Sequence, residues 1–248
     1  MGELNPLRIL REKLSHIYLD TLGYASGKEY TDAFIQRATS GTVFLDAGCG
    51  EGKIRKLLPD GVHYIGVDVF QGESAVGYAG WEHKPDVLAD LHQLPLKDSS
   101  CDVVILLHVL EHVQSPQKVL NELARVMKAG ATLVIAVPFV HQLHHVPHDY
   151  YRFSKYALQD LLDHTGLRVQ SIRPSGGYFR CLENVLSYFT VIFKSSSLIA
   201  KLVLAPLWVW IIALNRVVRI FEYPLDMLGG AQEFTAGYLC LALKAEDR

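Results

Sequence analysis

Three glycines that alternate with other residues follow an apolar run near residue 45, in a stretch that could do chemistry. The run 43–46 (Val-Phe-Leu-Asp) predicts a buried strand, and Gly48, Gly50 and Gly52 after it are typical of a tight turn before a helix. Because glycine has no Cβ, a ligand can lie directly against such a turn. Lys53 stands where a dinucleotide fingerprint needs its third glycine, and no Gly-Lys-Ser/Thr follows. The pattern therefore disfavours NAD binding and a P-loop.

A second acid stands at the spacing expected of a nucleotide site. Asp68 lies twenty residues after Gly48, at the end of a second predicted strand over 63–68. A carboxylate in that place can accept hydrogen bonds from both hydroxyls of a ribose. The alternative is a surface acid that caps a turn.

The run 46–52 (Asp-Ala-Gly-Cys-Gly-Glu-Gly) resembles the first motif of the class I S-adenosylmethionine (SAM) dependent methyltransferases, an acid followed by Gly-x-Gly-x-Gly. Asp68, the pair 90–91 (Asp-Leu) and the run 108–113 (His-Val-Leu-Glu-His-Val) match further segments of that family. The resemblance implies SAM as cofactor. It implies cofactor contacts from Asp46, Gly48, Cys49, Gly50, Gly52, Asp68, Val69, Asp90, Leu91 and His108.

Alternating strands and helices predict the fold that this family has. We expect strands at 43–47, 63–68, 86–90, 101–108, 132–138, 167–173 and 237–244, and helices at 53–58, 116–127 and 155–164. Helices of this length between strands imply a parallel, doubly wound sheet. The fold class is α/β, a Rossmann-like doubly wound seven-stranded sheet with an antiparallel last strand and a helical apolar insertion before it.

The segment boundaries follow from this reading. We expect an N-terminal helical cap at 1–40, because apolar residues between 6 and 22 have helical spacing. The SAM-binding core covers 41–174, the apolar insertion 175–236, and the last strand 237–248.

Histidines gather where a parallel sheet places its acceptor side. Of eleven histidines, four lie between residues 141 and 148, after the fifth predicted strand, and ligands bind beyond the carboxyl ends of such strands. Methyl transfer is an in-line displacement, and a hydroxyl acceptor must also lose a proton to a base. We expect His145, His148 and then His108 as general bases. We expect acceptor contacts from His112, His144, Asp149, Tyr150 and Arg152. The alternative is that these histidines are ordinary polar loop residues.

A metal site is a further alternative for His141, His144, His145 and His148, since imidazoles bind zinc and iron well. A structural zinc site in a loop usually recruits cysteine or a second, distant ligand pair, and no such partner is obvious in the sequence. We therefore predict no metal, and expect Glu111 and His112 to organise the turn near the cofactor.

The insertion is strongly apolar. Residues 202–214 include no charged side chain, but thirteen residues are too few to cross a bilayer, and Pro206 should bend a longer helix. Membrane contact, a homodimer interface and the wall of an apolar substrate pocket compete as explanations. We favour contact with a membrane surface.

Composition narrows the remaining function classes. The net charge of -2 gives no reason to expect a nucleic-acid partner. The four cysteines are widely spaced without a Cys-x-x-Cys pair, as in a reduced cytosolic protein. The location expected is the cytoplasm, with peripheral attachment to the inner face of the cell membrane.

The run 147–154 (Pro-His-Asp-Tyr-Tyr-Arg-Phe-Ser) resembles a stretch in bacterial type 11 methyltransferases of cell-surface glycan or lipid biosynthesis. The function expected is methyl transfer from SAM to a small-molecule or lipid-linked acceptor, at a hydroxyl. The alternative is a non-catalytic SAM-binding scaffold that docks on a membrane or partner through 175–236.

Overall fold

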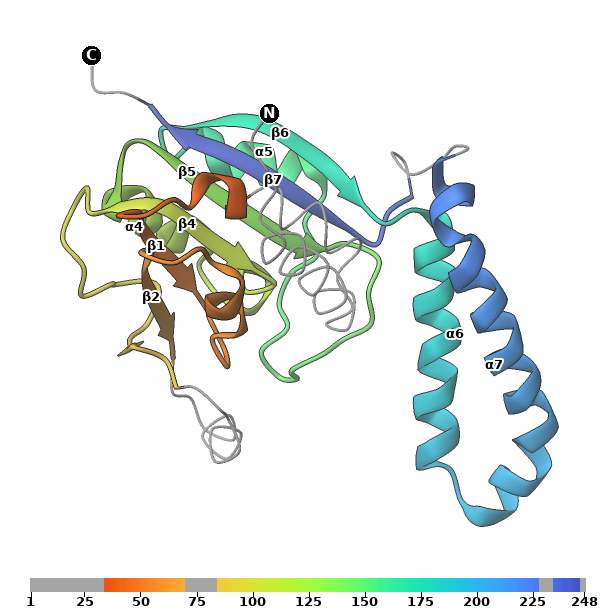
Figure 1. Cartoon of the computed structure of the whole chain (residues 1–248). Coiled ribbons are helices and arrows are strands. Elements are labelled where there is room, and N and C mark those ends of the chain that lie inside the picture. The colour runs from red at the N-terminus through yellow and green to blue at the C-terminus, as the bar shows by residue number, and fades with distance from the viewer. Residues whose placement is uncertain (1–33, 70–83, 228–233, 246–248) are drawn as a thin grey trace. The chain divides into compact units, whose positions relative to one another are not determined.

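A mixed sheet of seven strands carries the candidate site. The computed structural model describes residues 34–69, 84–227 and 234–245. Within these ranges the strand order is β3-β2-β1-β4-β5-β7-β6, and Figure 1 shows β7 running against its neighbours. The bounds are β1 Val43–Ala47, β2 His63–Asp68, β3 Val87–Leu88, β4 Cys101–Leu107, β5 Met127–Pro138, β6 Leu167–Ser175 and β7 Gly237–Lys244. The predicted Rossmann-like fold with an antiparallel last strand is confirmed.

The centre of the sheet is apolar on both faces. Leu45 of β1 lies between Ile65 of β2 and Val104 of β4, in parallel register with both. Leu45, Val104 and the next residue Ile105 are fully buried, as expected of strands covered on both faces. Because β1, β2, β4 and β5 are parallel, their carboxyl ends meet at one edge, where ligands bind in such sheets.

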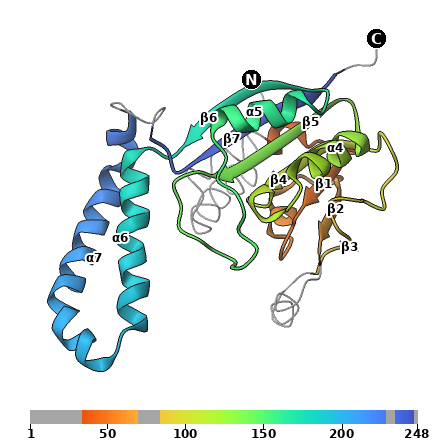
Figure 2. The ribbon, with the colours of Figure 1, turned by 180° about the vertical axis from the view of Figure 1, so that it is seen from behind.

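Two helices lie on one face of the sheet. They are α4 Pro116–Val126 and α5 Lys155–Asp163, and Figure 2 shows both on the side that faces the viewer. The buried residues of α4, Val119, Leu120 and Leu123, recur at helical spacing. The α5 helix begins after Ser154, whose side chain accepts a hydrogen bond from the third residue of the helix.

The connections differ from prediction in three places. We expected a helix at 116–127 that stops at the pattern Lys128-Ala129-Gly130, but α4 ends at Val126 and residues 127–130 belong to β5. Pairing of Met127 with Cys101 of β4 extends the strand and overrides the helix-end pattern of Lys128-Ala129-Gly130. The predicted helix at 53–58 is one 3-10 helix, η2 Lys53–Leu57, and the third strand has two residues.

The predicted cap at 1–40 lies mostly outside the described residues. The part of this range that the structure describes contains the 3-10 helix η1 Ile35–Arg37.

The apolar insertion forms a helical hairpin. Phe139–Gln142 and Pro174–Gly237 make a second compact unit, separate from the unit that holds most of the sheet. Within it, α6 Tyr178–Ser195 and α7 Leu198–Met227 pack side by side in opposite directions (Figure 1).

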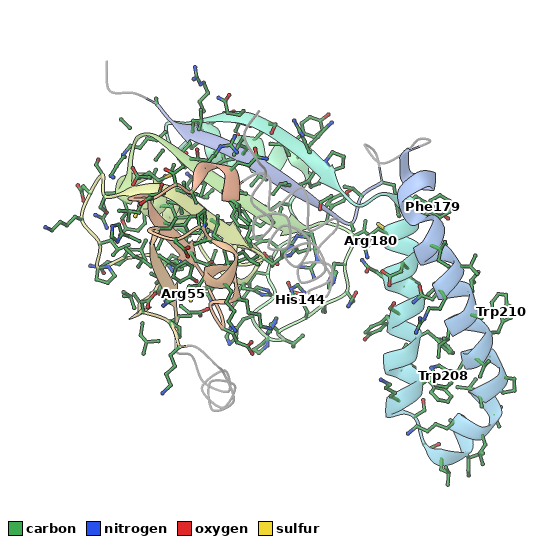
Figure 3. The ribbon with its side chains drawn as sticks, viewed as in Figure 1. Arg55, His144, Phe179, Arg180, Trp208 and Trp210 are labelled. Carbon is green, nitrogen blue, oxygen red and sulfur yellow. The ribbon has the colours of Figure 1, made fainter. Side chains whose placement is uncertain are left out.

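Polar and aromatic contacts join the two helices of the hairpin. The rings of Phe193 and Trp208 stack with centroids 4.6 Å apart, and Asn215 Nδ2 donates a hydrogen bond of 2.9 Å to Ser187 Oγ. Trp210 is 61% exposed and points away from α6 in Figure 3. One face of α7 is therefore used for packing while another is left bare.

The length of α7 exceeds the prediction. The helix runs through Pro206 without a break, so the apolar run joins its flanks. Residues 198–218 then form a stretch of 21 residues with mean hydropathy 2.0, of which only 6% is buried. By length and composition alone, among the described residues, this segment could cross a membrane.

Candidate active site

The glycine turn after β1 borders a cavity of about 290 Å³. Of the residues predicted to bind the cofactor, Asp46, Gly48, Cys49, Gly50 and His108 line it. Gly50 has φ +52°, and a Cβ built on it meets nothing within 4 Å, so its backbone faces open space. This is the cradle that a ligand lying against the backbone requires.

Gly48 has a different reason to be glycine. Its φ is +80°, and a Cβ built there would lie 2.3 Å from Cγ2 of Val109. Val109 belongs to the segment after β4, so Gly48 lets two loops at the carboxyl edge pack against each other. Ligand contacts were predicted from all three glycines. Gly48 lines the cavity and also makes room for Val109, and Gly52 precedes η2 with φ +63°.

Asp68 shapes the turn from the end of β2. Its Oδ2 accepts a hydrogen bond of 2.7 Å from Gly50 N, and its Oδ1 accepts one of 2.7 Å from Val69 N. A carboxylate offers about four acceptor sites, so these bonds still leave capacity for a ligand hydroxyl. The acid predicted to contact a ribose therefore also holds the ligand-facing backbone in place.

Asp46 is the buried acid of the turn. Tyr64 donates a 2.7 Å hydrogen bond from its hydroxyl to Asp46 Oδ2. Burial raises the pKa of Asp46 to about 7, although the bond from Tyr64 lowers it and the charge of Asp68 adds to the rise. The side chain therefore titrates near neutral pH beside the cavity.

Five predicted cofactor residues lie outside the cavity lining: Gly52 and Asp68 of the turn, and Val69, Asp90 and Leu91. Val69 and Asp90 are exposed, and Leu91 is buried. Asp90 Oδ1 accepts hydrogen bonds from the backbone N of His92 at 2.9 Å and pairs with its ring Nδ1 at 2.6 Å. Their contact with a cofactor stays a prediction.

The loop after β5 is fastened to the loop after β4. The short 3-10 helix η4 Leu110–His112 follows β4, and the carbonyl of Glu111 accepts hydrogen bonds from the backbone N of Tyr150 and Tyr151 at 2.9 and 3.3 Å. Tyr151 Oη also donates to the carbonyl of Gln114. The two loops that sequence analysis assigned to the acceptor side therefore form one structure.

Two predicted acceptor contacts, Asp149 and Arg152, bind each other in the loop. Arg152 donates to both oxygens of Asp149, at 2.6 and 2.7 Å, and Asp149 Oδ2 also accepts from the backbone N of His144 at 2.8 Å. The paired Arg152 lowers the pKa of Asp149 well below its usual range, and the His144 contacts lower it further. Asp149 is almost fully buried, so the pair holds the loop together.

Histidine rings gather beneath this loop around one carboxylate. Glu111 is fully buried, and its Oε1 lies 3.7 Å from a ring nitrogen of His108, of His112 and of His144. Burial raises the pKa of Glu111, but the neighbouring His108 and His144 outweigh it and lower the pKa overall. Burial lowers the pKa of His112. Figure 3 labels His144 on its loop.

The other loop histidines do not pair with Glu111 in the described residues, although the His145 ring packs edge-on against those of His112 and His144, with centroids 5.3 and 5.6 Å apart. His145 and His148 are exposed and do not line the cavity, and His148 Nδ1 lies 3.0 Å from the Tyr150 hydroxyl. His141 belongs to the second compact unit. Of the three predicted bases, His108 is the one that lines the cavity; its φ is +55°.

Sequence reasoning missed several residues that build the site. Tyr64 bonds Asp46, and Asp86 accepts from both Arg55 and Gly66 N, which ties η2 to β2. Tyr64 has a visible signal, because it sits in a predicted strand next to the one that ends at Asp46. Arg55 lies 4.5 Å above the Tyr64 ring, and nothing in the sequence links it to Asp86.

Comparisons with known proteins match the part of the chain that holds the glycine turn. Residues 45–135 match the family model described as a methyltransferase domain. The chain is 33% identical over 108 residues to the tRNA (carboxymethyluridine(34)-5-O)-methyltransferase of Arabidopsis thaliana, covering 42% of this chain and 26% of that protein. It is 36% identical over 100 residues to the demethylmenaquinone methyltransferase of Clavibacter sepedonicus, covering 39% and 41%. The matches span well under half of each relative.

A solved structure shows the same fold. The SAM-dependent methyltransferase from Archaeoglobus fulgidus superimposes with a TM-score of 0.56 at 19% identity, covering 97% of this chain and 100% of that one. The strand order, the glycine turn and the family match over 45–135 agree with one another. Together the domain match and the fold support a class I SAM-dependent methyltransferase.

Proposed function

We propose that the protein transfers the methyl group of SAM to a small-molecule or lipid-linked acceptor, at a hydroxyl. The observation that carries the proposal is the cavity at the glycine turn, which Gly50 opens on one side and His108 borders on another. The residues present fit the cofactor, because the cradle lacks a Cβ where a ligand must approach and Asp46 lines the same cavity. SAM supplies an electrophilic methyl group on a sulfonium.

Alignment is the main task left to the protein. The displacement is in line, so the chain contributes by fixing the acceptor opposite the leaving sulfur and by excluding water. The fastened loops after β4 and β5 hold His108 at the cavity, where it can take the hydroxyl proton as general base. His145 and His148 remain candidates that would need a movement of their exposed side chains.

His108→Gln tests the base. We expect kcat to fall by about 100-fold while SAM affinity stays within a few-fold, because a positioned base contributes about that much. His145→Gln and His148→Gln serve as matched controls. Loss of kcat in one of these variants, with His108→Gln active, would transfer the role to the exposed histidine.

The hairpin supports an acceptor at a membrane. Large apolar side chains at the start of α7 are each more than 70% exposed: Leu198, Ile199, Leu202 and Val203. An apolar helix with this much solvent exposure is expected to be buried against another surface. A stretch of 21 residues with mean hydropathy 2.0 is apolar enough to lie in the hydrocarbon region of a membrane. The lysines near this end, Lys194 and Lys201, can reach headgroups with their ammonium groups. We propose peripheral or inserted attachment to the inner face of the cell membrane.

Vesicle flotation tests the attachment. The full chain should float with vesicles of phosphatidylcholine and phosphatidylglycerol, and Leu202→Glu/Val203→Glu should reduce this binding strongly while the core stays folded. A matched control places Glu at the exposed surface of the sheet unit, as in Leu88→Glu. Recovery of a soluble dimer that ignores vesicles would instead favour the homodimer explanation.

The acceptor class requires a product. The experiment incubates protein and SAM with a membrane lipid extract and uses mass spectrometry to find species that gain one methyl group. A methylated lipid supports the proposal. SAM binding without any methylated product from lipid or soluble extracts would favour the scaffold, which needs the cofactor pocket and the hairpin but no base.

The tRNA relative gives little support for a nucleic-acid acceptor. Its match covers 26% of that protein, and the net charge of this chain is -2. The demethylmenaquinone relative, whose named acceptor is a quinone, agrees better with an apolar acceptor.

A further inference from the structure

The buried carboxylate of Glu111 is not compensated by hydrogen bonds from its surroundings in the described part of the chain. Its side chain is fully buried, and neither carboxylate oxygen has a hydrogen-bond partner among the described residues. Three imidazole nitrogens lie 3.7 Å from Oε1, which is too long for a hydrogen bond. A buried carboxylate is strongly unfavourable unless a positive charge or donors compensate it. Something positive is therefore expected between these groups.

Two of the rings are oriented from behind. His112 Nδ1 lies 2.5 Å from the carbonyl oxygen of His148, and His144 Nδ1 lies 3.2 Å from Asp149 Oδ2. An acceptor at Nδ1 fixes the hydrogen of a neutral imidazole on that atom, so the lone pair is on Nε2. In both rings Nε2 is the atom directed at Glu111 Oε1. Such outer acceptors are the usual support of metal-binding histidines.

We propose that Glu111, His112 and His144 bind one divalent transition-metal ion, with zinc as the expected occupant. The three ligand atoms lie within 4.8 Å of one another. Bonds of about 2.0–2.2 Å in a tetrahedral site place ligand atoms about 3.3–3.6 Å apart, so a modest inward movement of the side chains completes the site. Two imidazoles and one carboxylate are donors that zinc accepts, and they leave a fourth position open.

The distant ligand pair comes from the loop after β4. The histidine loop alone offers His144, while Glu111 and His112 come from η4, more than thirty residues earlier. The hydrogen bonds from Tyr150 and Tyr151 to the Glu111 carbonyl bring the two segments together. The site thus depends on the fold and is not a local sequence motif.

The position of the ion gives it a role in activating the acceptor, and this role rests on the proposed function. His108 contacts the same carboxylate at 3.7 Å and also lines the cavity at the glycine turn. An ion with an open position beside this wall would lower the pKa of an acceptor hydroxyl bound to it. Metal binding can be tested without any methyl transfer.

Direct titration tests the site on the full-length protein. The chain is stripped with a chelator, dialysed and titrated with ZnCl₂ by calorimetry, and bound metal is counted by mass spectrometry without SAM. We expect one equivalent of zinc. His144→Ala and His112→Ala should each weaken zinc binding by more than about 100-fold. Loss of an outer hydrogen-bond partner alone can cost up to that much, and loss of a ligand should cost more.

Two further histidines provide matched controls. His164 lies at the end of α5, so His164→Ala should retain full zinc affinity. His145 packs its ring against those of His112 and His144 but is not a ligand, so His145→Ala should keep zinc affinity within a few-fold. Glu111→Gln keeps the shape of the side chain and should also lose zinc. Circular dichroism on every variant separates loss of a ligand from loss of fold, and a cobalt(II) spectrum provides a second readout in the folded variants.

The alternative source of positive charge beside Glu111 is a pair of protons on the histidines. Absence of zinc, cobalt and nickel binding by folded wild-type protein would overturn the proposal, as would equal affinity in His144→Ala. Loss of binding in His145→Ala with retention in His144→Ala would also overturn it. Zinc binding without SAM binding would leave the metal site standing while refuting the proposed function.

Discussion

The glycine turn after β1 lies at the same edge of the sheet as the histidine cluster after β4 and β5. The two regions differ in whether their acidic side chains receive hydrogen bonds. In the turn, Asp68 accepts two backbone hydrogen bonds and Asp46 accepts one from Tyr64. In the cluster, the more deeply buried Glu111 has no donor within hydrogen-bond distance among the described residues. The turn is complete and offers open space, whereas the cluster still needs a positive charge.

This difference teaches how to tell two kinds of site apart. A site that binds an organic ligand against its backbone satisfies its own polar groups and leaves a cavity. A site that binds an ion leaves several acceptors directed at one point. The variants below are meant to break one region while leaving the other intact.

The largest effect is expected from Gly48→Ala. The new Cβ would lie 2.3 Å from Val109 at a φ of +80°, so strain and overlap together should cost about 2–4 kcal/mol of unfolding free energy. SAM binding should be lost with it. Gly130→Ala is the matched control, because its φ is +75° but its Cβ meets nothing within 4 Å, and strain alone should cost about 1–2 kcal/mol. Urea unfolding of both variants measures the difference, and equal losses would contradict the packing role of Gly48.

The next effect separates the cluster from the turn. At zinc concentrations 100 times the dissociation constant, wild-type stability should rise by about 2.7 kcal/mol relative to chelator, as linkage requires. Glu111→Gln should show almost no such rise, because the anionic ligand is gone. Thermal or urea unfolding with and without zinc measures it. A zinc-dependent rise of equal size in Glu111→Gln would remove Glu111 from the metal site.

The pH dependence of Asp46 tests the turn. Its pKa is raised from 3.8 to about 7, so the native state binds the proton more tightly and this group's contribution to stability falls as pH rises from about 4 to about 7. Asp46→Asn does not titrate and should gain on the wild type by up to about 4 kcal/mol between pH 4 and pH 8. Tyr64→Phe, which removes a donor, should widen that gap. Urea unfolding across pH checks it, and parallel profiles would refute the buried acid.

The smallest effect is expected at Asp90. Its side chain is 58% exposed and pairs with His92, outside the cavity lining. Asp90→Asn should weaken SAM binding by less than about tenfold, which corresponds to about 1.4 kcal/mol. Asp68→Asn, at the turn itself, provides the comparison. A larger loss at Asp90 than at Asp68 would show that Asp90 contributes more to SAM binding than the turn.

The sequence predicts the sheet well because most of its strands have clear apolar runs with recognisable ends. The run at 101–107 is apolar apart from Asp102, and Gly237–Lys244 is bounded as expected. The start of β5 at Met127 was missed because pairing with Cys101 is a tertiary contact that overrides a local helix-end pattern. The length of α7 was underestimated because Pro206 was expected to interrupt it.

The same distinction between local sequence signals and tertiary contacts applies to the candidate site. Residues of the turn are predictable because a motif places them within seven positions. The group formed by Glu111, His112 and His144 is not, because its members come from two loops that are joined by backbone hydrogen bonds to Tyr150 and Tyr151. A histidine excess directs attention to the correct loop, but spacing alone does not show which ring faces a buried carboxylate from another loop.

Calorimetric titration with SAM, on the wild type and on Asp68→Ala, tests the central claim most directly. We predict one SAM bound per wild-type chain and at least tenfold weaker binding in Asp68→Ala, with unfolding curves showing that the variant is folded. Absence of SAM binding by the wild type, or equal affinity in the folded variant, would contradict the assignment of the cofactor to the glycine turn.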